Sequence, residues 1–281
     1  MAEHDLAASD GVVRKELRVD GRAASYLTAG TGAGDVLLLL HGTYWSRVWQ
    51  RVIPRLAGAG ITPIAVDFPG CGRSDGELDP DSASVPALAS WVQGFVHSLA
   101  PTGVLGVAGH DIGGAVAQRL FVTDPSRFTK LAMVNSVTYD SWPVPTVARY
   151  RDPQVRAATG VAEFVAARRA VLTKAIGRPA SDDELDDYLD PWLEPRVVRS
   201  WMSIAAAAHQ SHTLELMHGL RRDVRPKLLL WGEHDTFQPV RFAERFASEV
   251  PDTRLVRVDG GHIPMENDPV TISDELRAFF D

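Results

Sequence analysis

Residues 105–120, LGVAGHDIGGAVAQRL, decide the fold. The first half is an apolar run typical of a buried strand, and the second half has the composition of a helix. Between them, Gly109 and Gly113 frame Asp111 in a tight turn. Because glycine tolerates strained backbone and close packing, the stretch predicts a sharp strand–turn–helix elbow. Such an elbow raises the side chain of Asp111 above the edge of a sheet.

The same alternation of strands and helices continues on both sides of this stretch. Residues 15–21 and 22–30 predict an antiparallel hairpin, and six apolar runs that end in polar or glycine residues predict buried strands. The segments between them predict helices at 46–59, 85–99, 114–123 and 240–249. Alternation of this kind is typical of an α/β fold with a mostly parallel sheet that helices flank on both faces.

One long gap interrupts this alternation. Between a strand that ends near Val137 and one that begins near Lys227, the sequence has only helical patterns, at 161–176, 181–189 and 196–209. We therefore expect a core of residues 1–137 and 223–281 and an inserted helical cap of residues 138–222. The cap should lie over the carboxyl ends of the strands, where open α/β sheets bind their ligands.

Size and composition limit the classes of function. The 281 residues fit one large domain, and the net charge of −7 without a long Lys/Arg run argues against binding to nucleic acid or to an anionic membrane. Cys71 is the single cysteine, which excludes an intrachain disulfide and a multi-cysteine metal site. The first sixteen residues lack the apolar core of a signal peptide. We expect a cytoplasmic monomer or homodimer without a metal or cofactor.

Further short motifs stand at the ends of predicted strands. They are His41-Gly42, DFPGCGRSD at 67–75, WGEHD at 231–235 and GGH at 260–262. With the elbow, these motifs resemble the α/β-hydrolase fold family over nearly the whole chain, from about Lys15 to Phe280. The order nucleophile, acid, histidine is the order that this fold uses. The resemblance implies an inserted cap and a catalytic triad.

The resemblance assigns the triad to Asp111, His262 and Asp235. Imidazole is the side chain best suited to shuttle a proton near neutral pH, and Asp235 would hold the tautomer of His262 and stabilise its cation. Glu233 and Asp140 are rivals for the acid, because some relatives place it after the preceding strand. His110 is expected to be structural, because the elbow points its side chain away from that of Asp111.

The aspartate at the elbow narrows the reaction class. A carboxylate that attacked an ester would form a costly mixed anhydride. Toward an sp³ carbon that bears a leaving group or a strained ring, it forms an alkyl-enzyme ester, which water activated by His262 then hydrolyses. The backbone N–H groups of Thr43 and Ile112 would stabilise the tetrahedral state. Alternatively, Asp111 is a base or the remnant of a lost site.

The resemblance therefore extends to the branch with an aspartate nucleophile, the epoxide hydrolases and haloalkane dehalogenases. Dehalogenases often have a tryptophan N–H donor after the aspartate and an asparagine after His-Gly, where this chain has Ile112 and Thr43. Epoxide hydrolases usually read His-Gly-x-Pro and Asp-Trp, where this chain has Tyr44 and Ile112. Epoxide opening needs a phenol as proton donor. Of the three tyrosines in or beside the cap, Tyr150 is preferred over Tyr139 and Tyr188.

Aromatic residues in and near the cap predict an apolar or aromatic pocket for a small organic substrate. Trp45, just after the oxyanion turn, and Trp142, in the cap, are candidate substrate-binding residues. His209 and His212 lack a third ligand and are not taken as a metal site. The sequence thus favours cofactor-independent hydrolysis of an epoxide. The alternatives are haloalkane dehalogenation and, from another class, a non-hydrolytic lyase or a ligand-binding protein that uses the same pocket.

Overall fold

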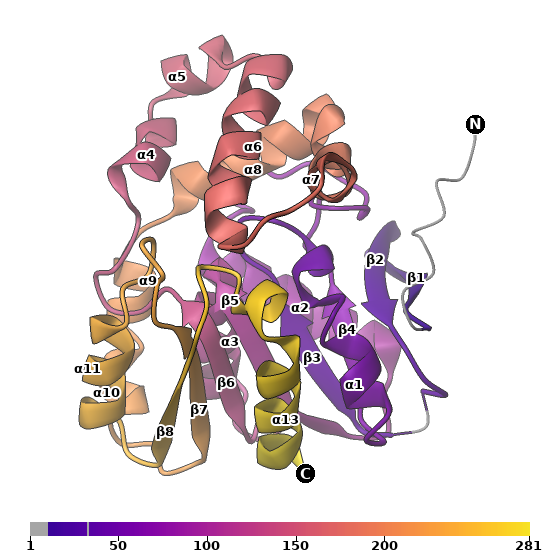
Figure 1. Cartoon of the computed structure of the whole chain (residues 1–281), viewed down its shortest axis with the longest axis vertical. Helices are drawn as coiled ribbons and strands as arrows, with labels where there is room; N and C mark the ends of the chain where they lie inside the picture. The colour runs from indigo at the N-terminus through magenta and orange to yellow at the C-terminus, as the bar shows by residue number, and fades with distance from the viewer. Residues whose placement is uncertain (1–10, 33) are drawn as a thin grey trace.

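The computed structural model describes residues 11–32 and 34–281, which contain one eight-stranded sheet (Figure 1). The strand order is β1-β2-β4-β3-β5-β6-β7-β8, and only the pairs β1–β2 and β2–β4 are antiparallel. The predicted mostly parallel α/β sheet, with its opening hairpin, is confirmed. Residues 1–10, which include most of the segment judged for a signal peptide, lie outside the described residues. The strands are β1 (Val13–Val19), β2 (Arg22–Thr28), β3 (Val36–Leu40), β4 (Thr62–Val66), β5 (Val104–Asp111), β6 (Leu131–Ser136), β7 (Lys227–Gly232) and β8 (Thr253–Val258).

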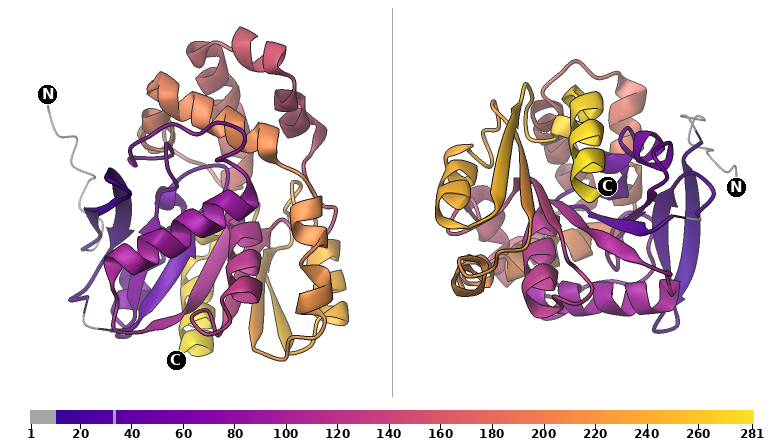
Figure 2. Two further views of the ribbon diagram at one scale, coloured as in Figure 1. Left: turned by 180° about the vertical axis from the view of Figure 1, so that it is seen from behind. Right: turned by 90° about the horizontal axis from the view of Figure 1, so that it is seen from below.

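The central strands are apolar because both of their faces are covered. In β3, Leu37 and Leu39 belong to the core on one face of the sheet, and Leu38 and Leu40 belong to the core on the other. This is the two-residue period of a strand, and burial of each leucine contributes about 1.5–3 kcal/mol. Helices α2 (Val85–Leu99), α3 (Ile112–Thr123) and α11 (Arg241–Glu249) cover the face that Leu38 and Leu40 enter, and α1 (Ile53–Ala57) and α13 (Pro269–Phe280) cover the other (Figure 2).

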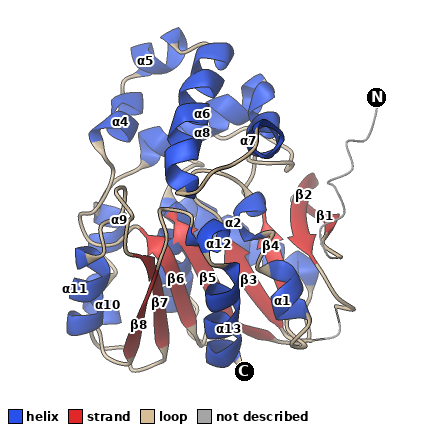
Figure 3. Cartoon of the chain, viewed as in Figure 1, coloured by secondary structure: helices blue, strands red, loops and turns tan. Residues whose placement is uncertain are grey.

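A layer of helices lies over the carboxyl ends of the parallel strands (Figures 1 and 3). We call this layer the cap, and its main helices are α6 (Val161–Ile176), α7 (Asp182–Leu189) and α8 (Pro195–Ala207). The short helices α4 (Pro145–Ala148) and α5 (Pro153–Ala158) precede them, with 3₁₀ turns η2 (Arg149–Arg151) and η3 (Asp190–Leu193) between elements. Helices α9 (Ser211–Leu214) and α10 (Met217–Leu220), inside the segment expected to form the cap, lie beside the sheet near α3.

One predicted helix differs in the structure. The segment 46–59 forms a 3₁₀ turn, η1 (Ser46–Trp49), followed by α1 rather than one continuous helix. The reason is Pro54, which has no N–H to donate and is accommodated only in the first turn of a helix. In residues 11–32 and 34–281, no helix has both the length and the apolar character needed to cross a bilayer.

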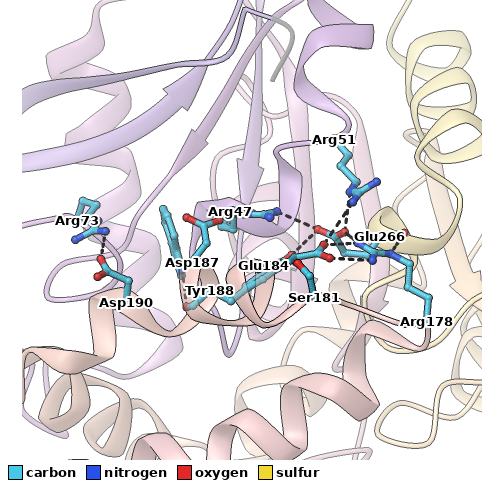
Figure 4. Close-up of polar contacts among 11 residues, drawn as sticks. Arg47, Arg51, Arg73, Arg178, Ser181, Glu184, Asp187, Tyr188, Asp190 and Glu266 are labelled. Carbon is cyan, nitrogen blue, oxygen red and sulfur yellow. Dashed lines mark hydrogen bonds and ion pairs between the residues drawn. The ribbon is translucent and has the colours of Figure 1, made fainter. Parts of the chain in front are cut away.

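A buried carboxylate joins the cap to the core (Figure 4). Glu266, in α12 (Pro264–Asn267), has a side chain that is 1% exposed. It accepts hydrogen bonds from the hydroxyl of Tyr188 in the cap, at 2.6 Å, and from Nη1 of Arg47 in the core, at 3.1 Å. It also pairs with Nε of Arg51, at 2.8 Å, and with Arg178, which follows α6. One carboxylate thus holds side chains from both layers.

Two further acids complete this cluster. Glu184 in α7 pairs with Arg178 and, at 3.4 Å, with Arg51, and Asp187 pairs with Nε of Arg47 at 2.5 Å. Three guanidinium groups therefore face three carboxylates, so the buried charge of Glu266 is balanced. Because a buried ion that loses its partner keeps its desolvation penalty, such clusters are sensitive to the loss of one member.

Glu266→Gln is expected to lower the free energy of unfolding by about 3 kcal/mol, because it leaves the three arginines around a neutral amide. Chemical denaturation with urea measures the change. Asp182→Asn is the matched control, since Asp182 is 88% exposed in its pair with Arg169 and such pairs contribute about 0–1 kcal/mol. Equal losses in the two variants would contradict a special role for the buried cluster.

Candidate active site

The elbow at Asp111 has the strained backbone that the sequence predicts. Asp111 ends β5 and precedes α3 with φ 51° and ψ −122°. A residue other than glycine in this region costs about 1–3 kcal/mol. The strain persists because the turn is packed closely: a Cβ at Gly113 would lie 2.4 Å from the carbonyl oxygen of His41, and one at Gly109 would lie 2.3 Å from that of Gly113. Only glycine fits at these two positions.

Thr43 holds one oxygen of the Asp111 carboxylate. Oδ2 accepts from the backbone N–H of Thr43 at 3.1 Å and from its hydroxyl at 2.6 Å. Within the described residues, Oδ1 has no hydrogen bond and is the oxygen available for attack on a ligand. Ile112 is the first residue of α3, so its N–H has no carbonyl partner within the helix. The sequence pointed to the Thr43 backbone as a donor, but not to its side chain.

His262 and Asp235 form a buried pair. Nδ1 of His262 lies 2.9 Å from Oδ2 of Asp235, whose Oδ1 accepts from the backbone N–H groups of Phe237, at 2.7 Å, and Gln238, at 3.0 Å. Burial acts to raise the pKa of Asp235, but the charge and hydrogen bond of His262 and the two N–H groups hold it below its usual range. For His262, burial acts to lower the pKa, yet the Asp235 and Asp111 charges raise it above the ordinary value.

Asn135, at the end of β6, positions this pair. Its Nδ2 donates to Oδ2 of Asp235 at 2.7 Å and to the carbonyl of Gly261 at 2.9 Å, and its Oδ1 accepts from the N–H of Gly232 at 2.8 Å. Its φ of 41° is a second left-handed residue in the site. Sequence reasoning missed Asn135. The available signal was a polar residue at the end of an otherwise apolar strand, LAMVNS.

The rival acids lie elsewhere. Asp140 and Glu233 are exposed and pair with Arg245, at 3.7 Å, and Arg257, at 4.0 Å. His110 is buried, and its Nε2 lies 2.8 Å from the carbonyl oxygen of His262. Burial, with the neighbouring His262, lowers the pKa of His110 to about 4. A neutral His110 donates through Nε2–H to that carbonyl, which is the structural placement that the sequence suggested.

A cavity of about 480 Å³ lies between the core and the cap, and both Asp111 and His262 line it. The cap contributes Tyr150 and Trp142, two of the predicted substrate-binding residues. The Tyr150 hydroxyl accepts from Arg149 at 2.8 Å, so its own proton remains free to donate. The rest of the lining is mainly apolar, including Ile112, Val137, Val144, Val147, Phe164, Val171, Trp201, Ile204 and Phe237.

The two tryptophans of the sequence prediction have different positions. Trp142 lines the cavity, but its indole N–H donates to Oγ1 of Thr213 at 2.8 Å and is not free for a ligand. Trp45 is not among the cavity-lining residues, because it packs under the cap and donates to the carbonyl of Tyr188 at 3.0 Å. The structure therefore places Trp142 in the pocket as an apolar wall and leaves Trp45 in the core.

The other two cap tyrosines point away from the cavity. The hydroxyl of Tyr139 bonds to Glu249 at 3.1 Å, and that of Tyr188 bonds to Glu266. Of the three phenols weighed in the sequence, the structure thus brings only Tyr150 to the cavity. His209 and His212 have ring centroids 6.4 Å apart, and the described part of the chain holds no group of three or more His, Cys, Asp or Glu side chains suited to a metal.

Two cavity residues escaped the sequence reasoning. Tyr44 lines the cavity, and its buried hydroxyl has no hydrogen-bond partner among the described residues. Arg168 lines the cavity from α6 and stacks on Trp201, with Cζ 3.7 Å from the ring centroid. The signals were weak: Tyr44 directly follows Thr43, and Arg168 lies four residues after Phe164, so that the two share one face of a helix.

Comparison with known proteins identifies the family. The model of the alpha/beta hydrolase family matches residues 37–275. The chain belongs to the alpha/beta hydrolase family. The AB hydrolase superfamily protein YfhM of Bacillus subtilis (strain 168) is 28% identical over 271 residues, which are 89% of this chain and 91% of that protein. This alpha/beta hydrolase is therefore similar to that relative over nearly its whole length.

Two further matches are dehalogenases by name. The haloalkane dehalogenase of Psychrobacter cryohalolentis is 33% identical over 123 residues, or 43% of this chain and 39% of that protein. The crystal structure of haloalkane dehalogenase DbeA from Bradyrhizobium elkani USDA94 superposes with a TM-score of 0.83 at 21% identity, and covers 96% of this chain and 97% of that one. The superposition confirms the α/β-hydrolase fold with its mostly parallel sheet and flanking helices.

The raised pKa of His262 sets an expected pH dependence. A base must be neutral, so the rate at which water hydrolyses the ester of Asp111, and kcat where that step is limiting, should rise with pH through the pKa of His262. Asp235→Asn removes the neighbouring negative charge and should shift the midpoint of this rise downward. Glu233→Gln is the control and should leave it unchanged. A shift in Glu233→Gln without one in Asp235→Asn would reassign the acid.

Proposed function

We propose that this alpha/beta hydrolase opens epoxides through Asp111 as the nucleophile, His262 as the base and Asp235 as its partner. The observation that carries the proposal is the presence of two phenols, Tyr44 and Tyr150, in the lining of the cavity that Asp111 enters. A carboxylate nucleophile needs an electrophilic sp³ carbon, and the oxygen that leaves an epoxide needs a proton. This mainly apolar cavity contains both the carboxylate that would attack the carbon and the phenols that would protonate the oxygen.

In the first step, Oδ1 of Asp111 attacks a ring carbon of the epoxide. The carbon–oxygen bond of the ring breaks, its electron pair stays on oxygen, and that oxygen takes the proton of a phenol. The products are a hydroxyalkyl ester of Asp111 and a phenolate. Oδ2 becomes the carbonyl oxygen of this ester, where the N–H and hydroxyl of Thr43 already donate to it.

In the second step, His262 takes a proton from water as the water oxygen attacks the carboxyl carbon of Asp111. The negative charge that develops on Oδ2 is stabilised by Thr43 and by the N–H of Ile112. The tetrahedral state collapses as its carbon–oxygen bond to the alkyl group's oxygen breaks; this alkoxide takes the proton of the new carboxyl hydroxyl to give the diol, Asp111 is left as a carboxylate, and the proton on His262 returns to the phenolate. Because the ester intermediate lacks the Asp111 charge, the pKa of His262 is lower in it than in the free enzyme. Water and epoxide give one diol, and no cofactor enters the balance.

Haloalkane dehalogenation is the second candidate, since the relative from Psychrobacter cryohalolentis carries that name. A departing halide needs N–H or similar donors. The side chain after the nucleophile is Ile112, the hydroxyl of Thr43 donates to Asp111, and the indole of Trp142 donates to Thr213. These three groups are apolar or already engaged, whereas the phenols and the N–H groups of Arg168 remain open to a ligand in the cavity. Only the oxygen of an epoxide needs the proton that a phenol supplies, and on that ground we place the epoxide before the halide.

His262→Gln should separate the two steps. Asp111 can still attack, but no base activates water, so the protein should stall as a covalent ester. Intact-protein mass spectrometry should show a mass increase equal to the whole epoxide, on a peptide that contains Asp111. For a haloalkane the increase equals the substrate minus hydrogen halide, so the same measurement distinguishes the two candidates.

Asp111→Ala is the control for this trap and should give neither adduct nor turnover. An adduct on another residue, or turnover of His262→Gln at the wild-type rate, would contradict the triad. If wild-type protein turns over a substrate but no electrophile leaves an adduct, Asp111 is a base and the lyase alternative replaces the hydrolase mechanism.

Tyr44→Phe and Tyr150→Phe should each slow ring opening, because each removes one proton donor from the cavity. Loss of a general acid costs about 10²–10⁴-fold in rate, and single-turnover formation of the ester measures this step. Tyr139→Phe is the matched control, since its hydroxyl bonds to Glu249 outside the cavity. Unchanged rates in both cavity variants would remove phenols from the mechanism.

A further inference from the structure

The charged side chains that line the cavity are mostly cations. Arg149, Arg168 and Lys174 line it together with a single carboxylate, that of Asp111. The protein as a whole has a net charge of −7, so this excess of positive charge is local. A cavity with such a lining attracts anions. Neither step of the proposed reaction requires it, because a neutral epoxide needs only the carboxylate, the imidazole and the phenols.

Arg168 is a half-buried cation of the lining whose hydrogen-bonding capacity is unused. Within the described residues, it makes no hydrogen bond and no ion pair with any side chain or carbonyl. Its contacts are with ring faces, at 3.7 Å from the centroid of Trp201 and 5.2 Å from that of Phe164. Arg47, by contrast, pairs with both Asp187 and Glu266. Stacking fixes the plane of a guanidinium and leaves its N–H edges free for a ligand.

The surroundings of Arg168 make this isolation costly. Burial lowers the pKa of Arg168, and the charge of Asp111 opposes this shift only weakly. Asp111 is thus close enough to attract Arg168 but forms no ion pair with it. A cation that the cavity wall partly desolvates, and that has no paired anion within the described residues, is unfavourable, and an anionic ligand would relieve this cost.

We propose that the substrate carries a carboxylate that pairs with Arg168, so that the enzyme acts on epoxy carboxylic acids; this inference rests on the proposed function of Asp111. The planar fork of a guanidinium matches a carboxylate through two parallel hydrogen bonds. The unpartnered hydroxyl of Tyr44 is a further donor in the same cavity. The remaining lining is apolar and suits the hydrocarbon part of such an acid.

The pairing also has a consequence for the reaction. A substrate carboxylate repels the attacking carboxylate of Asp111, and Arg168 offsets this repulsion by neutralising the substrate. The carboxylate takes no part in the bonds that form and break. Arg149 and Lys174, which are exposed, are placed to attract the anion toward the cavity before it reaches Arg168.

The test compares trans-2,3-epoxyhexanoate with its neutral amide, 2,3-epoxyhexanamide, in wild type and in Arg168→Gln. We expect wild type to prefer the acid in kcat/KM, and Arg168→Gln to lose about 10²-fold for the acid while it changes little for the amide. Arg169→Gln is the matched control, because Arg169 is the next residue of α6 and pairs with the exposed Asp182 and Asp186. It should leave both substrates unchanged.

Three outcomes would overturn the proposal. The first is that wild type favours the amide over the acid. The second is that Arg168→Gln slows both substrates equally, and the third is that Arg168→Lys retains no more activity toward the acid than Arg168→Gln does. Equal slowing would mean that Arg168 acts on the phenols, which both substrates need for ring opening, and does not bind the carboxylate of the substrate. The His262→Gln trap separates this failure from that of the proposed function: an adduct with the amide alone overturns only the role of Arg168, whereas no adduct with either overturns the nucleophile.

A measurement on wild type alone keeps the proposal testable if the Arg168 variants do not fold. Hexanoate and hexanamide cannot react with Asp111 and should compete for the cavity. Hexanoate is expected to inhibit at lower concentration than hexanamide, and its advantage should shrink as sodium chloride is raised, because salt screens the ion pair. Equal inhibition by the two compounds would contradict an anion site in the cavity.

Discussion

The strained turn at Asp111 is the constraint on which the rest of the site depends. A residue with φ 51° at the junction of β5 and α3 is stable only because the backbone of His41 and the two framing glycines pack against it without room for a Cβ. This packing sets where the carboxylate lies, and so fixes Thr43 beside Oδ2. The strain is local, while the eight-stranded sheet around it supplies the stability that offsets it.

The site is divided between a rigid core and a separately folded layer. The core supplies Asp111, His262 and Asp235 from strand ends that meet at one edge of the sheet, as parallel strands require. The cap supplies Tyr150, Trp201 and the cavity walls. The buried cluster around Glu266 fixes the two layers to each other close to the loop that bears His262, since Glu266 follows that histidine by four residues. The positions of the cap and of His262 are therefore held by one connected set of contacts.

Electrostatics distinguishes the two walls of the cavity. On the core side, Asp235 and Asp111 raise the pKa of His262, and Asn135 orients the acid by donating a hydrogen bond to its Oδ2. On the cap side, Arg168 faces the same space with its guanidinium stacked on Trp201 and, among the described residues, without an ion-pair partner. The carboxylate of Asp111 thus lies across an apolar space from a cation. Such an arrangement suits a ligand that has an electrophilic carbon at one end and a negative charge nearby.

The sequence by itself determined the sheet and the elbow, because these depend on apolar periodicity, glycine punctuation and strand ends, which are local. It proposed Asp111, Asp235 and His262 through the resemblance of their motifs to a known family. It also placed Tyr150 in the cap and Trp142 beside the cavity. Only the tertiary structure decided that Tyr188 and Trp45 serve the cap contact, that Asn135 orients Asp235, and that Arg168 reaches the cavity. Each of these depends on which helix face meets which strand end across more than fifty residues of chain. No local pattern encodes such a meeting, because an arginine on a surface-like helix face looks the same in sequence whether solvent or a cavity lies beyond it.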